Sequence, residues 1–161
     1  MKVNIVLSLL PAVLAAPNPL QKRLPNHTPV DVHGLDTDFT VFCDKTKTAG
    51  ADIHKAVSWG VNLEQAGDTL GDNKYPHYYG NNDDTRFKFL DPACHGTKNR
   101  REFPVVKGGY FEGHNEQVKK IRAIYVYDKS APYFNNPEAI YCGIIYHANG
   151  DFEGCDIEKK V

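Results

Sequence analysis

One stretch of this chain spaces its apolar residues as a helix does, and the other apolar stretches alternate as strands do. Between Ala51 and Leu70 the apolar residues recur every three or four positions, which predicts one amphipathic helix ending near Gly67 or Gly71. Strand-like alternation, with turn-rich segments between, occurs at 38–43, 86–90, 102–106, 121–127 and 139–147. The pattern predicts an α+β fold with a single long helix and an antiparallel sheet.

The N-terminal region predicts export and proteolytic processing. Residues 1–16 combine a basic start, an apolar run and a small-residue cleavage pattern, as a secretory signal peptide does. Residues 17–23 form a short propeptide whose Lys22-Arg23 end resembles a dibasic processing site, although a pair of ordinary surface charges explains it equally well. We expect a secreted, extracellular product with one domain, residues 24–161, and no membrane-spanning segment.

Four cysteines in an exported chain of this size predict two disulfides. The spacing of Cys43, Cys94, Cys142 and Cys155 is compatible with any of the three possible pairings. A zinc site is the competing interpretation, but no two of these cysteines are separated by two to four residues. We therefore expect disulfides and no metal.

The net charge limits how this chain can bind nucleic acid. Three of its 19 Lys and Arg lie in the first 23 residues, which leaves 16 basic against 20 acidic residues, a formal charge of −4. Tight binding of long nucleic acids without sequence preference depends on many phosphate contacts and favours a basic protein. The acidic balance argues against that class of protein, but it is compatible with a local site for one or two nucleotides.

Three polar side chains stand within the strand-like segments. Glu102, Arg122 and His147 are each flanked by apolar residues, so they would project onto one face of a sheet if their strands pair. Together they offer a base, a cation and an acid, which cleavage of an RNA phosphodiester by its own 2′-hydroxyl requires. Each also has an ordinary explanation: an exposed ion pair with Arg100 or Arg101, a solvated basic stretch, or a hydrogen-bonded histidine at a strand end.

Five short motifs occur in the order and with the spacing of a known family. They are Tyr75-Pro76-His77, Glu102-Phe103-Pro104, Arg122-Ala123-Ile124-Tyr125, Cys142-Gly143-Ile144-Ile145-Tyr146-His147 and the final Cys155. Through them, nearly all of residues 24–161 resembles the fungal extracellular guanyl-specific ribonucleases of the takadiastase type, whose fold is shared with the sarcin-like ribotoxins. The resemblance implies one helix packed on a twisted antiparallel sheet, single-stranded RNA as substrate and no cofactor.

The resemblance also implies a role for each candidate catalytic residue. Glu102 would take the proton from the ribose 2′-hydroxyl, and His147 would protonate the departing 5′-oxygen, which leaves a 2′,3′-cyclic phosphate. Hydrolysis of that phosphate would reverse the two roles. Arg122 would offset charge on the phosphorane, Tyr75 would donate a hydrogen bond to a phosphate oxygen, and His77 would orient Glu102 or share its work.

Guanine recognition would fall to the segment after the Tyr-Pro-His motif. The resemblance implies Tyr79 as the stacking ring and Asn81 and Asn82 as the turn. Asp83 or Asp84 would accept hydrogen bonds from the guanine edge, in place of the glutamate that the family uses. Because aspartate is shorter and the segment is longer than usual for the family, relaxed purine specificity is the alternative.

The disulfide pairing and one further aromatic residue follow from the same resemblance. Cys43 would pair with Cys155, as in the family, and Cys94 would then pair with Cys142, as in the ribotoxin branch. Phe152 matches a family aromatic residue near the active site, although packing in the core explains it equally well.

Three functions remain open on the sequence alone. The leading hypothesis is a secreted, guanyl-preferring endoribonuclease that acts as a monomer without a metal. One alternative is a ribotoxin that cuts a single ribosomal bond, which the short loops and acidic balance disfavour. The other is a catalytically silent secreted effector that binds RNA or ribosomes, which the presence of Glu102, Arg122 and His147 disfavours.

Overall fold

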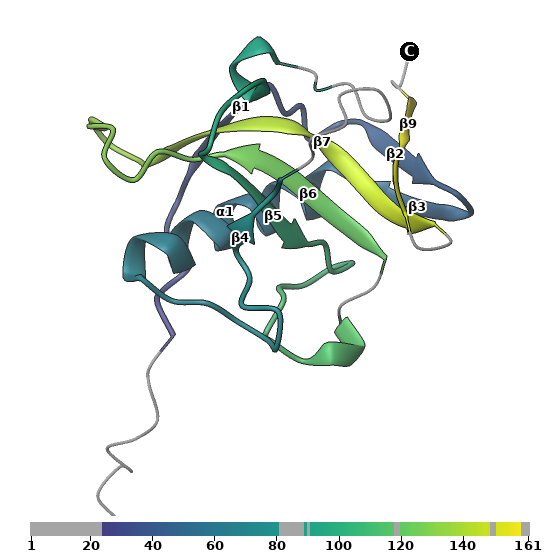
Figure 1. Ribbon diagram of the computed structural model, residues 1–161, viewed down its shortest axis with the longest axis horizontal. Coiled ribbons are helices and arrows are strands. Elements are labelled where there is room, and N and C mark those ends of the chain that lie inside the picture. The colour runs from purple at the N-terminus through teal and green to yellow at the C-terminus, as the bar shows by residue number, and fades with distance from the viewer. Residues whose placement is uncertain (1–23, 81–88, 90, 118–119, 149–150, 159–161) are drawn as a thin grey trace, which may run out of the picture.

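The computed structural model describes residues 24–80, 89, 91–117, 120–148 and 151–158. In this part of the chain a single α-helix, α1 (Gly50–Ala66), lies across one face of a β-sheet, and the other face of the sheet is turned toward the viewer in Figure 1. The α+β fold predicted from the sequence is confirmed. The strand predicted at 86–90 lies outside the described residues, apart from Phe89.

The main sheet is mixed and has six strands among the described residues. Across the sheet these are β1 (Asp31–His33), β7 (Glu138–Ala148), β6 (Ile121–Val126), β5 (Arg100–Pro104) and β4 (His77–Tyr78), with β8 (Asp151–Gly154) paired to the end of β7. All neighbours pair antiparallel except β1, which runs parallel to β7. The sequence did not predict this parallel pair, because three residues are too few to show alternation.

A smaller antiparallel sheet carries the N-terminal hairpin. Its order is β3 (Thr46–Ala49), β2 (Thr40–Cys43) and β9 (Asp156–Glu158). The disulfide Cys43–Cys155 joins the end of β2 to the residue before β9. A second disulfide joins Cys94, in a short 3-10 helix at Pro92–Cys94, to Cys142 in β7. Both predicted pairings are therefore confirmed.

The helix forms and ends as its sequence predicts. Ile53, Val57 and Val61 are buried at helical spacing and belong to the main core between helix and sheet. Gly67 adopts the left-handed conformation with φ of 69°, and its N–H bonds back to the helix, which ends there. A Cβ on Gly60 would overlap the hydroxyl of Tyr125 in β6, so glycine allows α1 to lie close to the sheet.

Each face of the main sheet carries its own apolar cluster. Phe103, Ala123 and Ile144 belong to the larger core, which includes the buried residues of α1. Ile124 and Ile145 belong to a smaller cluster that also contains Tyr79, Phe89, Cys94 and Cys142. The second face is therefore partly covered by Tyr79, Phe89 and Cys94 from the chain between β4 and β5.

Two sequence predictions concern export and membranes. The predicted signal peptide and propeptide, residues 1–23, lie outside the described residues. Over the part of the chain that is described, no helix has the length and apolar character needed to cross a membrane.

Candidate active site

The three polar strand residues share the face of the main sheet that is turned away from α1. Glu102 pairs with Ile124, which stands two residues from Arg122 in β6. Arg122 in turn pairs with Ile145, which stands two residues before His147 in β7. Because directly opposed residues project to the same side and a strand alternates with period two, all three polar side chains lie on one face.

A β-bulge in β7 is needed for this arrangement. Gly143 and Tyr141 pair with successive residues of β6, so Cys142 is the additional residue. Gly143 has φ of 145°, in the region that favours glycine. Without the bulge, strict alternation would put His147 on the same face as Tyr141, which belongs to the core beneath α1. The bulge thus brings His147 onto the face that carries Glu102.

The Tyr-Pro-His motif lies directly against Glu102. His77 pairs with Glu102 across β4 and β5, and His77 Nε2 lies 3.4 Å from Glu102 Oε1. The Tyr75 ring stacks on the His77 ring, with centroids 4.7 Å apart. Arg122 Nε donates a hydrogen bond of 3.0 Å to the Tyr75 hydroxyl oxygen. These contacts form a continuous chain from Glu102 through His77 and Tyr75 to Arg122.

Glu102 is a buried carboxylate with one unsatisfied oxygen. Its exposed fraction is 7%, and its Oε2 has no hydrogen-bond partner among the described residues. Burial raises the pKa of this carboxyl, and the nearby His77 and Arg122 act in the opposite direction. A carboxylate with a raised pKa and a free oxygen suits a general base.

Arg122 is a buried cation within reach of both candidate proton-transfer groups. Only 4% of it is exposed, and its Nη1 donates a 2.9 Å hydrogen bond to the Ile121 carbonyl. Its charge acts to lower the pKa of Glu102 and also that of His147. A guanidinium held in this way can offset negative charge that develops between the two.

His147 lies at the end of β7 against an aromatic pair. Its ring contacts that of its cross-strand partner Phe152, with centroids 3.9 Å apart, and the Tyr79 ring meets Phe152 edge-on at 5.9 Å. Burial lowers the pKa of His147, and the charges of Arg122 and Lys120 lower this pKa further. The aromatic pair thus forms a wall beside the imidazole.

The structure brings together every predicted site residue that it describes. The predicted catalytic residues Tyr75, His77, Glu102 and Arg122 are linked by direct contacts, and His147, Phe152 and Tyr79 continue the same face. The predicted turn and acceptor residues lie outside the described residues; these are Asn81, Asn82, Asp83 and Asp84.

The ordinary explanation for Glu102 as an exposed ion pair is wrong. Glu102 is buried and contacts His77 rather than its basic neighbours. Arg101 instead points to the helix side, where its Nη2 lies 2.7 Å from Oε1 of Glu64 in α1. Arg100 is a buried residue of the site face that the sequence analysis did not include. Its position two residues before Glu102 in the same strand could have indicated this, because residues two apart in a strand lie on the same face.

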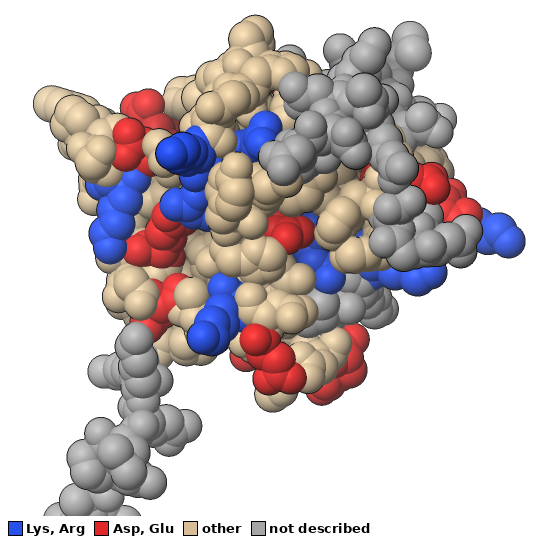
Figure 2. Space-filling model, viewed as in Figure 1, with Lys and Arg blue, Asp and Glu red and all other residues tan. Residues whose placement is uncertain are grey.

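Charges are mixed on the face that carries the site. Figure 2, which shows the molecule from this side, has Lys and Arg interspersed with Asp and Glu over its described surface. A protein that binds long RNA tightly through its backbone would need a broad basic surface instead.

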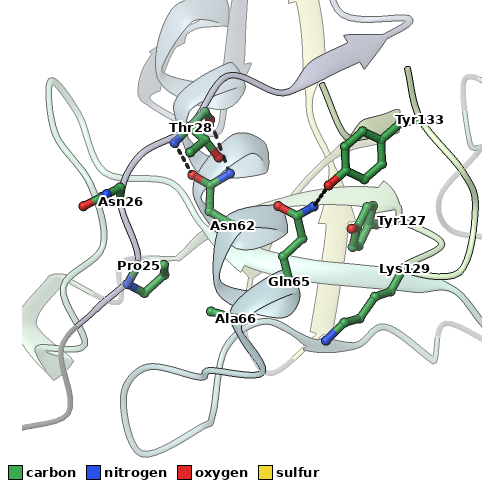
Figure 3. Close-up of a pocket in the computed structure, with 9 residues that line it drawn as sticks. All are labelled: Pro25, Asn26, Thr28, Asn62, Gln65, Ala66, Tyr127, Lys129 and Tyr133. Atoms are coloured by element: carbon green, nitrogen blue, oxygen red, sulfur yellow. Dashed lines mark hydrogen bonds between the residues drawn. The ribbon is translucent and has the colours of Figure 1, made fainter. Parts of the chain in front are cut away.

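A cavity of about 580 Å³ lies elsewhere, beside the C-terminal half of α1 (Figure 3). Gln65 donates a 3.2 Å hydrogen bond to the Tyr133 hydroxyl there, and Asn62 bonds to the backbone of Thr28. The residues that line this cavity include no carboxylate and no histidine. It therefore lacks an acid–base pair, and we place the candidate active site on the sheet face.

The site brings a buried carboxylate, an imidazole and a buried guanidinium together on paired strands. Over the described residues, no group of three or more His, Cys, Asp or Glu is placed to hold a metal ion. Comparison of the chain with protein-family models and with curated proteins found no match.

Proposed function

We propose that this protein is a secreted endoribonuclease that cleaves single-stranded RNA on the 3′ side of guanosine through a 2′,3′-cyclic phosphate. The observation that carries the proposal is the buried Glu102, paired with His77 on the sheet face that also bears Arg122 and His147. The sequence resemblance supports the preference for guanosine, and the signal-like residues 1–16 support secretion.

In the proposed first step, the Glu102 carboxylate accepts the proton of the ribose 2′-hydroxyl. The 2′-oxygen attacks the phosphorus, and the bond from phosphorus to the 5′-oxygen breaks. His147 gives its proton to that leaving oxygen. The substrate thus loses one proton to Glu102 and gains one from His147. Hydrolysis of the cyclic phosphate runs through the same groups in reverse, with His147 as base toward water and Glu102 as acid.

Arg122 stabilises the negative charge that accumulates on the phosphorane oxygens. Because Arg122 is buried and already bonded to Tyr75, little reorganisation is needed when that charge develops. His77 contacts Oε1 of Glu102 and so holds the carboxylate in place. The reaction needs only groups that the chain itself supplies.

The test is cleavage of the dinucleotides GpC, ApC and UpC by disulfide-bonded protein in the presence of EDTA. We expect wild-type protein to form 2′,3′-cyclic GMP from GpC, and Glu102→Gln and His147→Gln to lose about 10²- to 10⁴-fold in rate. Glu112→Gln and His114→Gln are matched controls, because these two residues form an exposed pair elsewhere, 4.0 Å apart. Both controls should retain full activity.

Each result has a defined meaning. Equal cleavage of GpC and ApC would retain the mechanism and remove the guanosine preference. Folded wild-type protein that cleaves no dinucleotide, or a fully active Glu102→Gln, would overturn the proposal. Release of one discrete fragment from intact ribosomes, without cleavage of dinucleotides, would indicate a ribotoxin instead.

A further inference from the structure

Arg100 is a buried cation on the site face that the proposed reaction does not use. Its exposed fraction is 5%, and it stands two residues before Glu102 in β5. A buried charge costs free energy unless hydrogen bonds compensate for the lost water. The groups that Arg100 contacts therefore indicate what its burial achieves.

Arg100 contacts three described residues in the segment between β4 and the end of the 3-10 helix, namely Tyr79, Phe89 and Cys94. Its Nε donates a hydrogen bond of 3.4 Å to the Tyr79 carbonyl, and its Nη1 donates one of 3.0 Å to the Cys94 carbonyl. The Tyr79 N–H donates in turn to the Arg100 carbonyl, at 3.2 Å. The guanidinium carbon also lies 4.6 Å from the centroid of the Phe89 ring. One side chain thus holds three separate points of this segment.

The residue that Arg100 holds by its backbone reaches the active site with its ring. The Tyr79 ring packs edge-on against Phe152, which contacts His147. Burial raises the pKa of Tyr79 to about 12, and the second cause is the charge of Glu102, which places the phenol within electrostatic reach of that carboxylate. A shift of the Tyr79 backbone would therefore move a ring that packs on the neighbour of His147 and lies within electrostatic reach of Glu102.

The proposed mechanism indicates which part of the substrate lies near the Tyr79 ring. The 2′-hydroxyl that Glu102 deprotonates belongs to the nucleotide on the 5′ side of the scissile bond. Since its ribose must lie against Glu102, its base lies nearby, where the Tyr79 ring is held. The position of Tyr79 should then affect how this base is bound.

We propose that Arg100 is a positioning residue that fixes Tyr79 against the active site, and so sets the discrimination between bases at the 5′ nucleotide. The inference rests on the proposed function and adds to it a residue that controls specificity without touching a reacting atom. A purely structural role would change stability and leave the ratio between substrates unaltered.

The experiment compares Arg100→Lys with Arg101→Lys. The first variant keeps the charge but loses the planar fork that reaches two carbonyls at once. The second is a matched control, because Arg101 is the next residue, faces the helix and pairs with Glu64. The measurement is kcat/KM for GpC and for ApC, with the urea midpoint of each variant.

We expect Arg100→Lys to lower the GpC to ApC ratio of kcat/KM about tenfold, mainly through a higher KM for GpC. Arg101→Lys should lower the urea midpoint and keep the ratio of wild type. Amide hydrogen exchange between Tyr79 and Cys94 should accelerate in Arg100→Lys alone. If Arg100→Lys does not fold, Phe89→Leu, which removes the ring beneath the guanidinium, should lower the ratio in the same direction.

The outcomes separate this inference from the proposed function. Wild-type protein that cleaves GpC and ApC equally overturns the positioning role and the guanosine preference but retains the cleavage mechanism. A folded Arg100→Lys with an unchanged ratio overturns the positioning role alone. Wild-type protein that cleaves neither dinucleotide overturns both.

Discussion

His77 and Glu102 face each other across β4 and β5, with Nε2 of the imidazole 3.4 Å from Oε1 of the carboxylate. The other oxygen, Oε2, is buried without a partner among the described residues. Leaving a buried polar atom unpaired costs about 1–3 kcal/mol, so proteins that bury carboxylates for stability pair both oxygens. The half-satisfied Glu102 therefore favours a role in function over one in stability.

Glu102→Gln should abolish most cleavage without lowering the free energy of unfolding at neutral pH. Burial raises the pKa of Glu102, so the folded protein holds this proton more tightly than the unfolded chain does. Ionisation of Glu102 above that pKa therefore costs stability, and neutral Gln avoids the cost. Urea unfolding at pH 7 measures the free energy of unfolding of Glu102→Gln and of wild type. Glu64→Gln is the control and should be destabilising, since it breaks the contact with Arg101; a large loss of stability in Glu102→Gln would contradict the interpretation.

Cleavage should have its pH optimum on the acidic side of neutrality. The base must be ionised, which requires a pH above the raised pKa of Glu102, and the acid must be protonated, which requires a pH below the lowered pKa of His147. The pH dependence of kcat/KM reports both groups in the free enzyme. The midpoint of the alkaline limb should lie below pH 6.5, the ordinary pKa of histidine.

Lys120→Gln should move that alkaline limb to higher pH. The charge of Lys120 is one cause of the lowered pKa of His147, so removing this charge stabilises the imidazolium and raises the pKa of His147. Lys107→Gln changes an exposed lysine that is not among the causes of this shift and serves as the control. The measurement is the pH profile of kcat/KM on GpC. An alkaline limb that does not move, or that moves to lower pH, would argue against His147 as the acid.

Tyr75→Phe should reduce kcat/KM by about tenfold, which corresponds to the loss of one hydrogen bond to a charged group. The variant keeps the ring that stacks on His77 and removes only the hydroxyl that accepts from Arg122 Nε. Tyr141→Phe is a matched control, because its buried hydroxyl has no partner among the described residues. That control should keep full activity and equal or higher stability. Similar activity losses in both variants would mean that the Arg122 contact is not responsible.

Gly60→Ala should lower the free energy of unfolding by about 1–3 kcal/mol, although alanine favours a helix, because the added methyl overlaps the Tyr125 hydroxyl. Adding Tyr125→Phe should restore part of the loss. The restoration stays partial because Phe103 Cδ2 is also 3.2 Å from the new methyl group. Urea unfolding of the two single variants and the double variant forms a double-mutant cycle. A double variant no more stable than Gly60→Ala would exclude this close approach as the cause.

Several parts of the fold could be predicted from local patterns. The spacing of Ile53, Val57 and Val61 predicts α1, and Gly67 ends it because glycine readily adopts positive φ. Alternation predicts β5, β6 and β7, which are long enough to show period two. The short strands β1, β3, β4, β8 and β9 were not predicted, because two to four residues carry almost no periodic signal.

For the candidate site too, some features could be predicted from the sequence and others depended on the tertiary structure. The sequence by itself determined which residues are candidates for the site, because charged side chains amid apolar alternation are rare and the motif order resembles that of a known family. Only the tertiary structure decided that Glu102 is buried, since the two residues before it in the chain are arginines and its burial comes from other strands. Only the bulge at Cys142 puts His147 on the sheet face that carries Glu102, and only strand pairing brings Tyr79 to Arg100. Register and burial arise from contacts between distant segments, which no local pattern contains.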